Sequence, residues 1–263
     1  MSINQEDLIS MYNRAQALSN ASKWVEALLE INEALAVDAT DLDVVTMKAI
    51  ILNELKQNTE SIKLFKTILT RDPDNFVANY NIGVACVEDN NLDAAIESFE
   101  KCVNIDNESS NALFQYGNVL RSAGFLDKAE NAYLQGLKTG ERVDDLCCNL
   151  IVTLNQQRKF GEATKYWSEY AMTSLDADVA IAHGQSLLGL SDFTAAVTVF
   201  ENAVILDPDS PLAWFCLGDA RELLNLIPEA IEAFRHDLSI DSNNTDVAQR
   251  LEMIQYDQQE SAV

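Results

Sequence analysis

Two histidines and five cysteines are the residues of this 263-residue sequence best suited to zinc binding or thiol chemistry. A zinc or redox site needs such residues at short, defined spacings, for example Cys-x-x-Cys. His183 and His236 are far apart in the sequence, and Cys147 is directly followed by Cys148. We therefore expect packing or surface roles for these side chains and predict no metal site, no cofactor and no catalytic residue.

Acidic residues are abundant, but they do not form a known catalytic or calcium-binding pattern. The stretches 72–75 and 89–93 lack the glycine and the final glutamate of a calcium loop, and the nine glycines form no phosphate-binding loop. These stretches read instead as helix ends and N-caps. We predict that the protein is not an enzyme, and the role of an accessory subunit beside a separate enzyme remains open.

The charge balance narrows the choice of partners. Eighteen basic residues against 42 acidic residues give a net charge of −24, which argues against nucleic acid and against anionic membrane surfaces. No basic residue occurs between Lys165 and Arg221. This acidic stretch is either a solvated face or a field that steers a basic partner.

Two features bear on the cellular compartment. The N-terminus has no secretory pattern, and no apolar run approaches the length of a membrane span. The odd number of cysteines, mostly at apolar helical positions, suits reduced thiols in a reducing compartment. We therefore expect a cytoplasmic protein without membrane insertion.

A sequence repeat organises the chain, and its period of about 34 residues indicates stacked supersecondary units. Small residues recur at that spacing, with one slightly shorter step before Ala196: Ala27, Ser61, Ala95, Ala129, Ala163, Ala196 and Ala230. A large apolar residue follows four positions later in every case: Ile31, Phe65, Phe99, Tyr133, Trp167, Phe200 and Phe234. Repeats of this kind serve mainly to present a surface.

Each repeat contains two stretches with helical periodicity. In residues 76–109 these stretches run from Val77 to Glu88 and from Asp93 to Asn104, with the polar pair Asn90-Asn91 between them. A short break of this kind suits a tight turn between antiparallel helices. Because one helix pair cannot bury its apolar face alone, neighbouring pairs must stack.

The last repeat carries the clearest family pattern. It contains Trp214-x-x-Leu217-Gly218 followed by Ala230-x-x-x-Phe234. The proline that closes the pattern follows the large apolar position in two other repeats, at Pro73 and Pro208. The chain thus resembles the tetratricopeptide repeat (TPR) family. The resemblance implies an all-α fold, a right-handed superhelical solenoid of antiparallel helix pairs.

We predict one continuous array of repeats rather than two domains, because no linker interrupts the regular spacing of the repeats. Residues 1–7 form a lead-in, and residues 245–263 form a capping helix and tail. The seven repeats between them span 8–41, 42–75, 76–109, 110–143, 144–176, 177–210 and 211–244.

The resemblance also implies that the first helix of each repeat lines a concave groove. The groove positions predicted for partner binding are Tyr12, Asn13, Tyr80, Asn81, Phe114, Gln115, Asn118, Arg121, Asn149 and Gln185. Side-chain amides both donate and accept hydrogen bonds, so a row of them suits the backbone of an extended peptide. The alternative is that these amides are repeat consensus and serve only local backbone or solvent.

Two functional classes follow. The first is an interaction module or scaffold that binds an extended or helical segment of another protein, of basic character if the acidic field steers it. The second is a structural protein that forms homo-oligomers through its repeat surfaces. Neither needs a cofactor.

Overall fold

The structure is a computed structural model that describes residues 5–171 and 174–261, with side chains described as far as Tyr256. The first four residues of the expected lead-in and the last two residues of the expected tail lie outside this part. The chain divides into two compact units, Met1–Phe125 and Leu126–Val263, which we call the N-terminal and C-terminal units. Each is described by itself.

The described residues form helices connected by short turns, and no strand occurs among them. The N-terminal unit contains α1 (Gln5–Asn20), α2 (Trp24–Val37), α3 (Leu42–Glu54), α4 (Asn58–Leu69), α5 (Phe76–Glu88), α6 (Leu92–Ile105) and α7 (Ser110–Ser122). The C-terminal unit contains α8 (Leu126–Leu137), α9 (Val143–Gln156), α10 (Phe160–Tyr166), η1 (Trp167–Ala171), α11 (Ala177–Gly189), α12 (Phe193–Leu206), α13 (Pro211–Leu223), α14 (Ile227–Ile240) and α15 (Thr245–Ser261). The all-α prediction is confirmed.

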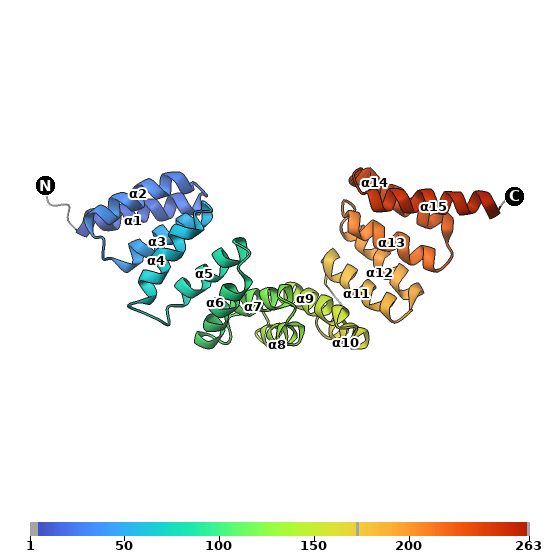
Figure 1. The fold of residues 1–263 in the computed structure, drawn as a ribbon, viewed down its shortest axis with the longest axis horizontal. Coiled ribbons are helices and arrows are strands. Elements are labelled where there is room, and N and C mark those ends of the chain that lie inside the picture. Colours follow the sequence, from blue (N-terminus) through green and yellow to red (C-terminus); the bar gives the residue numbers. More distant parts are fainter. Residues whose placement is uncertain (1–4, 172–173, 262–263) are drawn as a thin grey trace. The chain divides into compact units, whose positions relative to one another are not determined.

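Within each unit, every helix packs against the next helix along the chain (Figure 1). The first helices of successive repeats also touch, as α1 touches α3 and α11 touches α13. This is the packing of a solenoid of helix pairs. The unfolding of the repeats as one cooperative array, and the superhelical path of the whole chain, stay predictions.

The repeated small and large residues build the core. The seven small residues that define the phase, from Ala27 to Ala230, are all fully buried, and six of the seven large residues that follow them are as well. Gly83 on α5 lies directly against the Phe99 ring of α6. A Cβ on Gly83 would lie 2.8 Å from this ring, so the close approach of the two helices requires glycine there. The exception among the large residues is Trp167, which stays partly exposed.

Trp167 begins the one irregular helix in the described part of the chain. There α10 runs for seven residues and continues as the five-residue π-helix η1. The single shortened step of the repeat, from Ala163 to Ala196, falls across this segment. The indole of Trp167 stacks on the imidazole of His183, with ring centroids 3.8 Å apart and planes 7° apart.

The turn inside each repeat has one backbone signature. The second residue after the first helix has a positive φ of 56–82°, and these residues keep the repeat spacing: Ser22, Lys56, Asn90, Gly124, Arg158, Ser191 and Asn225. The next residue donates its N–H back to the helix, as Gln57 does to the Leu52 carbonyl at 2.9 Å. This is a Schellman motif, which ends the first helix and fixes the entry of the second.

Two asparagines tie neighbouring repeats together. Asn53 Nδ2 donates to the Asn81 carbonyl at 3.0 Å, and Asn155 Nδ2 donates to the Ala182 carbonyl at the same distance. Ser186 Oγ also donates to Asn155 Oδ1 at 2.8 Å. Each bond joins the first helices of successive repeats, so these amides stabilise the stack.

The last helix packs on the C-terminal unit through one face. Val247, Leu251 and Ile254 on α15 are buried, and Arg250 pairs with Asp219 at 3.3 Å and with Glu222 at 2.9 Å. Glu252 on α15 is exposed, and in the repeat spacing it matches Gly218 on α13. A Cβ on Gly218 would lie 2.5 Å from the Phe234 ring, so a glutamate at the matching position does not suit such close packing.

Candidate functional site

The predicted groove residues of the N-terminal unit lie on the first helices of their repeats. Tyr12 and Asn13 are on α1, Tyr80 and Asn81 on α5, and Phe114, Gln115, Asn118 and Arg121 on α7. Asn13 is exposed and the other seven are partly buried. In the C-terminal unit, Asn149 lies on α9 and Gln185 on α11, both partly buried. A binding role for these residues stays a prediction.

Two of the predicted amides bond to their own helix. Asn81 Nδ2 donates to the Val77 carbonyl at 2.8 Å, and Asn149 Nδ2 donates to the Asp145 carbonyl at 2.9 Å. These bonds match the alternative in which the amides serve local backbone. The bond uses only one of the two Nδ2 hydrogens of Asn81, so the second hydrogen and Oδ1 remain for a ligand or solvent.

Tyr80 and Gln185 also have packing contacts. The Tyr80 ring stacks on Phe76 at 6.0 Å and meets the Phe99 ring edge-on at 5.6 Å. Gln185 Nε2 lies 4.0 Å from the Cys216 sulfur on α13. These contacts hold both side chains in defined positions.

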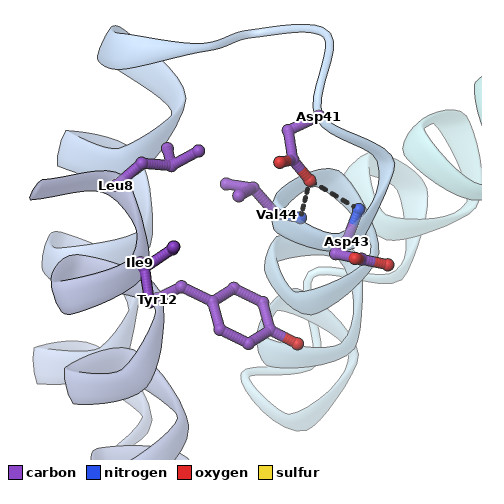
Figure 2. Close-up of a pocket in the computed structure, with 6 residues that line it drawn as sticks. All are labelled: Leu8, Ile9, Tyr12, Asp41, Asp43 and Val44. Atoms are coloured by element: carbon purple, nitrogen blue, oxygen red, sulfur yellow. Dashed lines mark hydrogen bonds between the residues drawn. The ribbon is translucent and has the colours of Figure 1, made fainter. Parts of the chain in front are cut away.

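A pocket between α1 and the start of α3 adds residues that the sequence had not suggested. Its volume is about 160 Å³, and it is lined by Leu8, Ile9, Tyr12, Asp41, Asp43 and Val44 (Figure 2). Of these, only Tyr12 was predicted as a site residue. Asp41 and Asp43 come much later in the chain than Tyr12, and only the contact between α1 and α3 brings them together.

The two carboxylates of this pocket have different surroundings. Asp41 is the N-cap of α3, and its Oδ1 accepts the N–H groups of Asp43 at 2.9 Å and Val44 at 3.2 Å. Asp43 lies in the first turn of α3, on the rim of the pocket (Figure 2). The Tyr12 ring extends from α1 toward this turn. Burial, and then the charges of Asp43 and Asp41, raise the pKa of the Tyr12 hydroxyl, so the phenol stays neutral at pH 7.

The pocket combines an apolar wall with an acidic rim. Leu8 and Val44 are buried, whereas 55% of Ile9 is exposed to solvent. A lysine or arginine side chain matches this arrangement, since its stem is apolar and its end is cationic.

In the described part of the chain, the cysteine and histidine side chains do not form a metal-binding cluster. Burial raises the pKa of Cys102, Cys147 and Cys216 to about 12, which keeps these thiols protonated. Among the residues that the structure describes, no group of three His, Cys, Asp or Glu side chains has metal-binding geometry. Within the same residues, no helix is both long enough and apolar enough to cross a membrane.

Two segments of the chain match known protein families. Residues 77–109 and residues 181–243 each match a tetratricopeptide repeat family. The chain is a tetratricopeptide repeat protein. Repeats of this family generally serve as protein-interaction scaffolds rather than as enzymes.

Two curated proteins match most of this TPR chain. A DnaJ homolog subfamily C member 7 homolog of Dictyostelium discoideum is 22% identical over 92% of the chain and 41% of its own length. A TPR repeat-containing protein of Methanocaldococcus jannaschii is 21% identical over 88% of the chain and 38% of its own length. The chain therefore spans about two fifths of the length of these relatives.

Solved structures share the fold. A TPR protein from Parabacteroides merdae superposes with a TM-score of 0.68 at 12% identity, covering 95% of this chain and 99% of that one. YrrB, described as a TPR protein with an unusual peptide-binding site, gives a TM-score of 0.55 at 17% identity, covering 72% of this chain and 97% of YrrB. At these identities the likeness concerns the fold.

Proposed function

We propose that this TPR protein binds an extended, basic segment of another protein along the first helices of its repeats. The observation that carries the proposal is the pocket at Tyr12, where an apolar wall meets the carboxylates of Asp41 and Asp43. The partly exposed Asn81 on α5 adds hydrogen-bonding capacity on another first helix of the same unit. The peptide-binding site named for YrrB supports the mode of binding.

Electrostatics favours a basic occupant. The net charge of −24 attracts cationic segments over several ångströms, and it repels nucleic acid. In the pocket, a lysine or arginine can place its stem against Leu8 and its cationic end beside Asp43. A cytoplasmic location and the absence of a cofactor belong to the same proposal.

The test compares peptides that differ only in charge. An array of extended peptides is prepared in matched pairs, with lysine and arginine in one member and glutamate and glutamine in the other. The intact protein should bind the basic members, and its affinity should fall with added salt. The Asp43→Asn variant should bind them about three- to tenfold more weakly, which corresponds to a loss of roughly 0.7–1.4 kcal/mol.

The control removes one carboxylate from elsewhere in the same unit. Asp74 is exposed in the turn between α4 and α5, and it does not line the pocket. Asp74→Asn makes the same change in net charge outside the pocket, and because no pocket contact is lost it should leave the affinity close to that of the wild type. Equal binding by the Asp43→Asn variant and the wild-type protein, or equal capture of acidic and basic peptides, contradicts the proposal.

A further inference from the structure

A second pocket lies in the N-terminal unit, among α4, α5 and α6. Its volume is about 350 Å³, and its lining includes Ile62, Lys66, Asn79, Ile82, Cys86 and Lys101. None of the predicted groove residues lines it, so it is separate from the peptide site proposed above. Three lining residues are almost fully buried: Asn79 is 2% exposed, Cys86 is 5% exposed and Ile82 is 7% exposed.

The seventh repeat of the same chain shows what occupies this place elsewhere. When Ala95 is aligned with Ala230, Asn79 of the third repeat pairs with Trp214 of the seventh, and Pro73 in the turn before the third repeat pairs with Pro208. Asn79 Nδ2 donates to the Pro73 carbonyl at 3.2 Å, and Trp214 Nε1 donates to the Pro208 carbonyl at 2.8 Å. Asn79 therefore makes the hydrogen bond of the tryptophan without supplying its ring.

The residues around Asn79 also differ from those around Trp214. The same alignment pairs Cys86 with Arg221, Lys66 with Glu201 and Lys101 with His236. Arg221 Nη2 in the seventh repeat donates to Glu201 Oε1 in the sixth repeat at 3.0 Å. The ring of His236 stacks on that of Trp214, with centroids 4.4 Å apart.

The third repeat thus replaces the two largest side chains of this region by an asparagine and a cysteine. The smaller side chains explain why the pocket exists here. A cavity of this size lies within the range of small-molecule sites, which combine apolar side chains with a few polar groups. Here Ile62, Leu69 and Ile82 provide apolar contact, and Asn91, Glu97 and Ser98 are among the polar lining residues. A lysine takes the position of the stacking histidine, and a lysine ammonium over a ring face gives a favourable cation–π contact.

We propose that this pocket is a binding site for an aromatic ring of indole size. The ring occupies the volume that Trp214 fills in the seventh repeat, against Ile62 and Ile82. Lys101, which lines the pocket and pairs with Glu97 at 2.8 Å, contributes the cation for this ring. The occupant is a free aromatic molecule or an aromatic side chain, and the experiment below separates these sources.

The experiment is a calorimetric titration of the full chain with indole and, separately, with N-acetyl-tryptophanamide. We expect indole to bind with a Kd on the order of 0.1–1 mM. Binding of the amide as well indicates that the pocket takes a tryptophan side chain, and binding of indole alone indicates a free ring. Failure of both probes to bind at about ten times that concentration overturns the proposal.

A matched pair of variants locates the site. Asn79→Trp should fill the pocket, raise Tm by about 2–6 °C and abolish indole binding. Asn20→Trp places the same side chain at an exposed position of α1, and it should bind indole like the wild type. Indole binding that survives Asn79→Trp contradicts the proposal.

A measurement on the wild-type protein covers the case in which Asn79→Trp does not fold. Indole should shift the backbone amide resonances of α4, α5 and α6 and leave those of the seventh repeat unchanged. Shifts spread evenly over the helices, or confined to helices other than these three, overturn the assignment of the site.

Discussion

Gly184→Ala is expected to destabilise the protein by about 3 kcal/mol, because the added methyl group has no room. A Cβ at this position would lie 2.4 Å from Cε1 and 2.6 Å from Cζ of the Phe200 ring. Phe200 is fully buried in a core cluster with Ala196 and Ala203, so the ring cannot move away without disturbing α11 or α12. Urea unfolding followed by circular dichroism measures the loss.

The control is a glycine with free space around it. Gly161 lies in the first turn of α10, and no atom is found within 4 Å of a Cβ built there. Gly161→Ala should leave the free energy of unfolding unchanged or raise it by about 0.5–1 kcal/mol, since alanine favours the helix. Phe200→Leu should partly rescue Gly184→Ala. A Gly184→Ala protein as stable as the Gly161→Ala protein would show that the helices do not approach this closely.

Acidification should destabilise the protein through His183 by about 3 kcal/mol as the pH falls toward 4. Burial lowers the pKa of His183 from 6.5 to about 4, and 5% of the residue is exposed. The unfolded chain therefore binds a proton below about pH 6.5, whereas the folded protein does so only near pH 4. The contribution of His183 to stability is complete above pH 6.5 and is lost between these values.

A variant isolates this effect from other titrations. Burial raises the pKa of Asp219 and Asp237, so acidification relieves the cost of burying these charges and acts in the opposite sense. His183→Phe keeps a ring against Trp167 and removes the titration. The free energy of unfolding is measured in urea from pH 7 to pH 4. As the pH falls, the wild type should lose more stability than the variant. Parallel pH profiles would show that His183 is solvated.

The packing of the helix pairs could be predicted from the sequence because a fixed period places the same positions on the same helix face. Six of the seven large residues that recur with this period, from Ile31 to Phe234, are fully buried, and Trp167 is partly exposed. The π-helix changes the rotation per residue there, so the tryptophan leaves the core position and stacks on His183. The shortened step between Ala163 and Ala196 was the available signal of this irregularity.

The candidate site was less predictable, for two physical reasons. The pocket at Tyr12 depends on Asp41 and Asp43, whose sequence context indicates the start of a helix and not a binding surface. The hydrogen bonds of Asn81 and Asn149 depend on side-chain rotamers, which a repeat pattern does not specify. The polar Asn79 at an aromatic position was visible in the sequence, but the empty volume beside it became apparent only through the comparison with Trp214.

The most direct test of a partner surface on the first helices is site-specific photo-crosslinking to a basic extended peptide. One protein carries the photoreactive amino acid at Gln115, on α7. The other carries it at Lys63, an exposed position of the second helix α4 in the same unit. We predict adducts from position 115 and none from position 63. Equal adducts from both positions, or adducts from position 63 alone, would contradict binding along the first helices.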